Sequence, residues 1–189
     1  RAQACQLRCG ESERAIPITI RAMMAVMPAA QEPIASRAPV PAQVIDANAS
    51  EMVAAREASR LPVMRKDLIL DPWQVAGSRV LGADAILIIM AAVTDTQAAQ
   101  IEAAASHWGM DVLIDVRSRE EMERAARLKS PLLIINNKDP MTKQVDLDRT
   151  RALARFAPIN HQIIAEGGLS APADLAGLAR YGVRAFVIG

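Results

Sequence analysis

Charged and amide side chains recur in this sequence at the points where short apolar runs end. Lys66 follows the apolar segment 61–64, and Asp115 and Glu166 stand at the ends of two later apolar runs. Asn136 closes another run, directly before a second asparagine. A lysine opposite two carboxylates, with an amide between them, is suited to proton transfer on a polar substrate. These four residues are the candidate catalytic set.

Glycines stand beside two of the strand ends. Gly167 and Gly168 follow Glu166, and Gly189 follows the last apolar run. Glycine leaves its backbone N–H group accessible, and groups of such N–H donors bind phosphate. The three glycines therefore predict a phosphate site and a phosphorylated, sugar-like substrate.

Each candidate also has a simpler structural interpretation. A lone lysine at a strand end is usually solvated, and the two carboxylates could form ion pairs with Arg117 or Lys138. Asn136 could belong to a turn, and the paired glycines could form another. The recurrence of polar residues at four strand ends favours the functional interpretation.

The apolar runs alternate with helical patterns, and this alternation predicts a parallel sheet. A helix is expected from Asn48 or Ser50 to about residue 59, and Asp71-Pro72 and Ser118 mark the starts of later helices. Asp95 is expected to open a further helix. Strands are expected near residues 62, 84, 111, 131, 162 and 184. A repeated phrase, Gly-x-Asp or Gly-x-Arg, closes three of the helices at Gly82, Gly109 and Gly182.

Six βα units fit either a doubly wound sheet or an eight-stranded barrel. No glycine-rich dinucleotide loop follows any strand, and polar residues recur at nearly every strand end rather than at one crossover point. Both features favour a (β/α)8 TIM-barrel type of α/β fold. The barrel domain is expected at residues 44–189. Residues 1–43 are rich in proline and are expected to be unassigned or poorly ordered chain.

The composition narrows the classes of function. A net charge of +1 over 189 residues gives no indication of a nucleic-acid partner. No run of 18 apolar residues is present, so no membrane-spanning helix is expected. Cys5 and Cys9 lack further metal ligands nearby and are interpreted as free thiols in a reducing compartment, which favours a cytoplasmic location and no metal site.

Several motifs resemble those of the indole-3-glycerol phosphate synthase family. Residues 61–67 with 71–75 are similar to the third strand and following helix of that family, and Ile135–Asp139 (INNKD) resembles its strand-six motif. Strands four, five, seven and eight have similar counterparts in residues 82–88, 109–116, 165–169 and 185–189. The resemblance covers about residues 44–189 and implies a (β/α)8 barrel in which strands 3 to 8 are recognisable.

The resemblance implies a lyase of tryptophan biosynthesis. The family closes the pyrrole ring of 1-(2-carboxyphenylamino)-1-deoxyribulose 5-phosphate with loss of CO2 and water, without a cofactor. The resemblance implies Lys66 as the general acid that protonates the substrate carbonyl, and Asn136 as the residue that orients the substrate. It implies that Glu166 lies near the substrate hydroxyls, and that Gly168 and Gly189 lie around the phosphate.

The sequence departs from the family pattern in four respects. Asp115 stands where the family has a glutamate, so the carboxylate is retracted by one methylene. A misplacement of about 1 Å can lower a rate roughly 100-fold. Gly167 replaces a serine, and Pro140 replaces a leucine. The first-strand motif of the family, Glu-x-Lys followed by Ser-Pro-Ser, has no counterpart in residues 1–43.

These departures leave alternative functions open. The chain could be a catalytically impaired fragment or a non-enzymatic paralogue of the family. It could also be another phosphosugar-binding barrel, such as a phosphoribosyl isomerase, although those usually need a paired acid and base. An incomplete barrel exposes strand edges and an apolar interior, so association through the open edges is expected.

Overall fold

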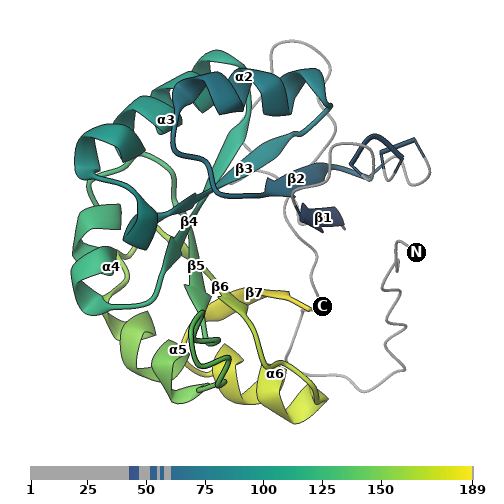
Figure 1. The fold of residues 1–189 in the computed structure, drawn as a ribbon. Helices are drawn as coiled ribbons and strands as arrows, with labels where there is room; N and C mark the ends of the chain where they lie inside the picture. The colour runs from purple at the N-terminus through teal and green to yellow at the C-terminus, as the bar shows by residue number, and fades with distance from the viewer. Residues whose placement is uncertain (1–42, 47–51, 55, 58–60, 189) are drawn as a thin grey trace.

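Seven parallel strands form one sheet, in which each strand pairs with its neighbours in chain order. The structure is a computed structural model that describes residues 43–46, 52–54, 56, 57 and 61–188. The strands are β1 (Gln43–Asp46), β2 (Val63–Lys66), β3 (Ala85–Ile89), β4 (Asp111–Val116), β5 (Leu132–Asn136), β6 (Gln162–Glu166) and β7 (Val183–Val187). Figure 1 shows the sheet curling into an arc with β1 and β7 at its two ends.

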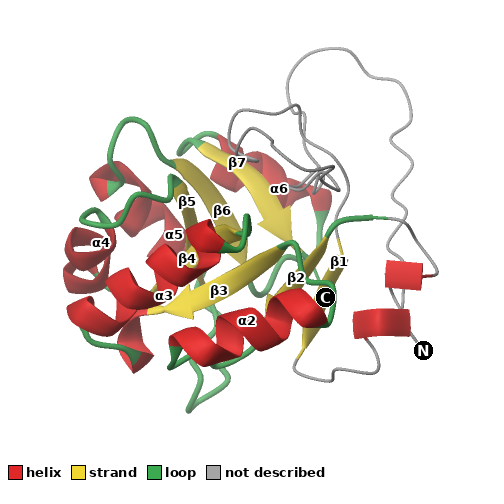
Figure 2. Ribbon diagram, turned by 90° about the horizontal axis from the view of Figure 1, so that it is seen from above, coloured by secondary structure: helices red, strands yellow, loops and turns green. Residues whose placement is uncertain are grey.

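Helices follow the strands and lie around the outer side of the arc, as Figures 1 and 2 show. They are α2 (Pro72–Val80), α3 (Asp95–His107), α4 (Arg119–Ala125), α5 (Asp148–Leu153) and α6 (Pro172–Ala179), with short 3-10 helices at Met90–Ala92 and Ala154–Phe156. Residues 52–54, 56 and 57 are also helical, as expected. None of these described helices is long and apolar enough to cross a bilayer. A curled parallel sheet covered by helices is an incomplete (β/α)8 barrel, which confirms the predicted fold class.

β1 is a strand that the sequence pattern does not predict. It pairs with β2 in a register that runs from Gln43↔Val63 to Asp46↔Lys66. Prolines interrupt the sequence just before it, so its four residues give no clear strand signal. The barrel therefore shows seven strands where six are expected. The expectations for residues 1–42, and for helix caps at 48 and 50, lie outside the described residues.

The helix starts agree with the sequence at three positions. Asp71 and Ser118 each accept a first-turn backbone N–H and are the N-caps of α2 and α4. α3 begins at Asp95, as expected. The hydroxyl of Thr94 accepts the N–H of the third helical residue, and Asp95 lies just inside the helix. An acidic side chain in the first turn still interacts favourably with the helix dipole.

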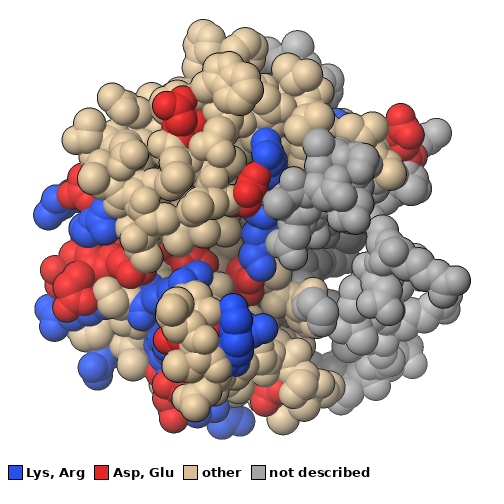
Figure 3. Space-filling model, in the orientation of Figure 1, with Lys and Arg blue, Asp and Glu red and all other residues tan. Residues whose placement is uncertain are grey.

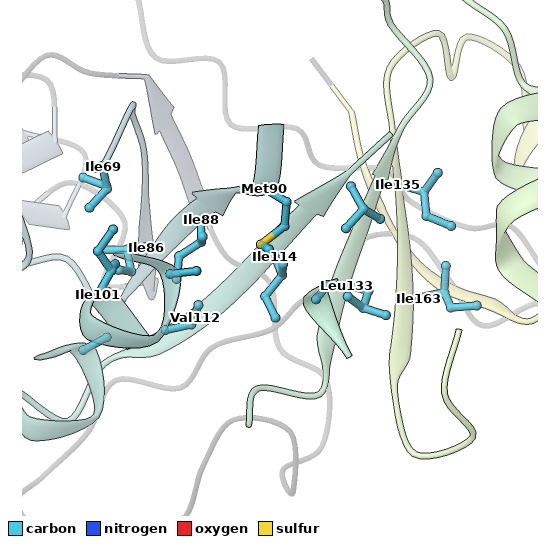
Figure 4. Close-up of a cluster of buried hydrophobic side chains, with 14 of the residues drawn as sticks. Ile69, Ile86, Ile88, Met90, Ile101, Val112, Ile114, Leu133, Ile135 and Ile163 are labelled. Atoms are coloured by element: carbon cyan, nitrogen blue, oxygen red, sulfur yellow. The ribbon is translucent and has the colours of Figure 1, made fainter. Parts of the chain in front are cut away.

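The strands alternate between two apolar layers, because successive side chains point to opposite faces of a sheet. The larger layer packs against the helices and includes Ile86, Ile88 and Ile114; Figure 4 shows part of it. The residues between them, such as Leu87 and Leu113, belong to a second cluster on the inner face. Burial on both faces explains why β3 and β4 are continuous apolar runs.

Replacing a side chain of the larger layer should lower stability markedly. Ile114 is fully buried, so we expect Ile114→Ala to lower the free energy of unfolding by about 2–5 kcal/mol. Ile159 is fully exposed, and Ile159→Ala should change it by less than about 0.5 kcal/mol. Urea denaturation followed by circular dichroism measures both. Equal effects of the two substitutions would contradict this account of the core.

Candidate active site

The four candidate catalytic residues lie on the inner face of the sheet, at or near the carboxyl ends of their strands. Each stands two positions beyond an apolar residue of the inner cluster, and two positions along a strand return a side chain to the same face. The pairs are Met64 and Lys66, Leu113 and Asp115, Ile134 and Asn136, and Ile164 and Glu166. The face that buries the inner cluster thus becomes polar at its carboxyl end.

An ion pair joins β2 to β6 at this rim. The Nζ atom of Lys66 lies 2.5 Å from Oε1 of Glu166. The Glu166 side chain is 9% exposed, so this carboxylate is largely withdrawn from water. Its second oxygen, Oε2, is buried without a hydrogen-bond partner among the described residues. A buried carboxylate oxygen in this state can accept a hydrogen bond from a ligand.

The amide of Asn136 is fixed at both of its ends. Its Nδ2 donates to Oδ2 of Asp115 at 3.2 Å, and its Oδ1 accepts the backbone N–H of Lys138 at 3.0 Å. The amide orientation follows from this network, since one end faces an acceptor and the other a donor. Each end keeps capacity for one further hydrogen bond. Asn136 is also in register with Glu166, so it reaches the same rim as the ion pair.

Asp115 lies beneath this rim, 1% exposed. Burial raises the pKa of its carboxyl from 3.8 to about 6. The nearby guanidinium of Arg117 and the hydrogen bond from Asn136 oppose the increase, while Glu166 and Glu121 add to it. The Nε atom of Arg117 is 3.3 Å from Oδ1 of Asp115, which is the ion pair that the simpler interpretation of the sequence foresees. A carboxyl with this pKa changes its charge just below neutral pH.

A pocket of about 210 Å³ opens above these residues. Its lining includes Lys66, Asn136 and Glu166, together with the basic side chains Arg117, Lys138 and Lys143 and the acidic Asp139. Figure 3 shows basic and acidic side chains side by side near the middle of this face, whereas the surface over α2 carries little charge. Four basic side chains against two acidic ones favour an anionic ligand. The sequence pattern did not single out Lys143, because it lies in a loop beyond the strand end.

Two of the three glycines of the predicted phosphate site belong to the part of the chain that the structure describes. Gly167 lines the pocket. Gly168 has φ +71°, and a Cβ atom added there would lie 1.9 Å from Cγ1 of Val145, so the site has room only for glycine. Gly189 lies outside the described residues.

Asn137 is a supporting residue that the sequence did not place in the candidate catalytic set. It is fully buried, and its backbone N–H donates to the carbonyl of Glu166 at 2.8 Å. Its Nδ2 donates to the carbonyl of Gly167 at 3.3 Å, while its Oδ1 accepts from the Thr150 hydroxyl at 2.6 Å. Asn137 therefore ties the ends of β5 and β6 to α5, and so fixes the backbone on which the pocket is built.

Within the described part of the chain, no group of three or more His, Cys, Asp or Glu side chains is placed to hold a metal ion. Cys5 and Cys9 lie outside that part. The functional groups gathered here are thus an ammonium, two carboxylates and an amide, with further cations at the rim. Such a set can donate and accept protons and can bind an anion.

Comparisons with known proteins match one family over most of the chain. A sequence model of the indole-3-glycerol phosphate synthase family matches residues 42–189. The chain is 51% identical over 138 residues to the indole-3-glycerol phosphate synthase of Azospirillum brasilense, covering 73% of this chain and 53% of that protein. The enzyme of the same name from Rhodospirillum rubrum is 47% identical over 143 residues, covering 75% and 54%. The chain spans about half the length of the curated relatives that it matches.

Replacing Gly168 by alanine should lower the stability of the protein more than replacing Gly109, a glycine of similar backbone conformation. Gly109 has φ +64° and nothing within 4 Å of an added Cβ. Gly109→Ala should therefore lower the free energy of unfolding by about 1–2 kcal/mol, the cost of holding alanine in the left-handed conformation. Gly168→Ala adds the overlap with Val145, which should cost about 1–3 kcal/mol more. Thermal denaturation measures the difference. Val145→Ala, made together with Gly168→Ala, should recover part of it, and no recovery would count against the overlap.

The burial of Asp115 should lower stability at neutral pH. Its pKa is raised on folding, so its contribution to stability is retained below pH 3.8 and is lost as the pH rises through about 6. We expect Asp115→Asn to raise the free energy of unfolding at pH 8, by at most about 3 kcal/mol, with a smaller gain at pH 5. Urea denaturation at the two pH values measures this effect.

Asp174 supplies a control of the opposite sign. Backbone N–H groups of residues 171 and 170 lower the pKa of its carboxyl, so Asp174→Asn should lose stability at pH 8 rather than gain it. A loss of stability in Asp115→Asn at pH 8 would show that its hydrogen bond and ion pair outweigh the cost of burial.

Proposed function

Because the chain belongs to the indole-3-glycerol phosphate synthase family, we propose that it takes part in the reaction for which that family is named. The proposed substrate is 1-(2-carboxyphenylamino)-1-deoxyribulose 5-phosphate. The aromatic carbon that bears the carboxylate bonds to the substrate carbonyl carbon. CO2 then leaves that carbon, and the former carbonyl oxygen leaves as water.

The ion pair of Lys66 with Glu166 is the observation that carries this proposal. An ion pair requires the lysine to hold its proton, and this is the form that a general acid uses. Lys66 is half-buried at the pocket, with its side chain 29% exposed, so a substrate oxygen can approach it. In the proposed reaction, Lys66 gives its proton to the carbonyl oxygen as the ring closes.

Asn136 and Glu166 are proposed to hold the substrate during this step. The fixed amide of Asn136 keeps one N–H and one oxygen lone pair for a polar substrate group. The free Oε2 of Glu166 suits a substrate hydroxyl. Asp115 contacts Asn136 and Arg117 rather than lining the pocket, so its proposed part is to fix the charge and geometry of the groups above it.

The phosphate is proposed to lie near Gly167, Gly168 and Gly189. Lys138 and Lys143 line the pocket together with Gly167, and their positive charge supports this placement. A phosphorylated, carboxylated substrate is strongly anionic, and an excess of basic side chains attracts it. We further propose that the protein acts in the cytoplasm. Association of the chain through its edge strands β1 and β7 stays a prediction.

Replacing Lys66 tests the proposal. Lys66→Met removes the proton donor while keeping most of the side-chain volume, and should lower kcat about 10²–10⁴-fold. Lys129→Met is the matched control, because Lys129 is exposed and does not line the pocket; its kcat should stay within about twofold of the unchanged chain. Indole fluorescence reports product formation from the synthetic substrate.

Two results would contradict the proposal. No turnover by the unchanged chain, with substrate still bound in calorimetry, would favour a non-enzymatic paralogue. Turnover that survives Lys66→Met would favour another phosphosugar chemistry at the same rim.

A further inference from the structure

Arg117 is a charged residue of the pocket to which the proposed reaction gives no task. It follows the last residue of β4, and its side chain is 22% exposed. Its backbone N–H donates to Oε2 of Glu121 at 2.7 Å, which fixes its main chain at the start of α4. Its guanidinium lies against the buried Asp115 on one side and lines the pocket on the other.

The contact between Arg117 and Asp115 is a charge contact rather than a hydrogen bond. Nε of Arg117 lies 3.3 Å from Oδ1 of Asp115, yet neither atom has a hydrogen-bond partner among the described residues. The other oxygen of Asp115 accepts the N–H of Asn136. The carboxylate is thus the middle member of a chain of three side chains, from Arg117 through Asp115 to Asn136.

The ionised form of Asp115 strengthens the orientation in which the amide of Asn136 is held. A carboxylate accepts the Nδ2 proton, whereas a protonated carboxyl can instead donate to an oxygen. Reversing the amide would set Nδ2 against the backbone N–H of Lys138, which now donates to Oδ1. Two donors would then face each other, and the amide would lose its fixed orientation.

We propose that Arg117 is a positioning residue, which keeps Asp115 ionised beneath the pocket and thereby holds Asn136 in its substrate-orienting conformation. The effect of Arg117 on catalysis rests on the proposed function. The link between Arg117 and Asp115 does not depend on that function.

The groups around Asp115 make Arg117 the decisive neighbour. Glu166 from β6 and Glu121 from α4 both disfavour the ionised form, and burial disfavours it further. Lys66 is paired with Glu166 at the rim. Asn136 contributes a neutral hydrogen bond. Among the described charged groups with the largest effects on Asp115, Arg117 is the one that favours the carboxylate.

Arg117→Met tests this inference, with Arg117→Lys as the conservative variant and Arg127→Met as the control. Arg127 is exposed and pairs with Asp95, and neither residue lines the pocket. We expect the acid limb of the kcat/KM profile to move to higher pH in Arg117→Met by about one pH unit, because an opposite charge at this distance has been removed. Arg117→Lys should move it less, and Arg127→Met should leave it unchanged.

A titration of the Asp115 carboxyl carbon by nuclear magnetic resonance gives a readout that needs no turnover. Comparison with Asp115→Asn identifies the resonance. Its midpoint should move to higher pH in Arg117→Met, whether or not the chain is active. If the unchanged chain gives no product but the midpoint moves, the proposed function fails and the link between Arg117 and Asp115 stands.

Two outcomes would overturn the inference. An unmoved midpoint in a folded Arg117→Met protein shows that Arg117 does not control Asp115; should that variant not fold, the same titration of Arg117→Lys decides. A raised KM with an unmoved acid limb shows instead that Arg117 contacts a substrate anion directly.

Discussion

Seven strands run parallel and pair in chain order, so their carboxyl ends come together along one rim. The side chains at that rim come from segments far apart in the sequence. Lys66 ends β2 and Glu166 ends β6, yet their charged atoms are 2.5 Å apart. The curl of the sheet makes this possible, because it turns the inner faces of separated strands toward each other. The pairing of Lys66 with Glu166 depends on that geometry.

The inner face also changes character along the strands. Apolar residues such as Leu113 and Ile134 fill its lower part, and polar residues two positions later form its rim. This places Asp115 and Asn136 directly above an apolar layer, where water is largely excluded. Charges interact more strongly in such surroundings, and unpaired polar groups are more costly. The site can therefore hold an ionisable carboxylate, but only with Arg117 and Asn136 against it.

Support for the rim comes from the neighbouring loop and helix. Asn137 is buried beside Asn136 but faces the other way, toward Thr150 of α5 and the carbonyl of Gly167. One asparagine thus faces the pocket, and the next fixes the backbone that presents it. The alternation of side chains along a strand separates these two tasks between adjacent residues.

Much of the fold could be predicted from local patterns. Continuous apolar runs gave β3 and β4, and Asp71 and Ser118 gave two helix starts, because these signals act within a few residues. One local signal was missing, because the four residues of β1 are too few to form a pattern beside prolines. The curl of the sheet was inferred only from recurring polar strand ends and from the family resemblance.

The sequence by itself determined which residues stand at the strand ends, because hydrophobic periodicity and turn residues are local properties of the chain. It therefore named Lys66, Asp115, Asn136 and Glu166 as the candidate set. Only the tertiary structure decided how they pair. It set Lys66 on Glu166, buried Asp115 below the pocket on Arg117, and brought the loop residue Lys143 to the rim. The pairing of Lys66 with Glu166 depends on strand register and sheet curvature, which arise from contacts between distant segments and leave no mark at any single position.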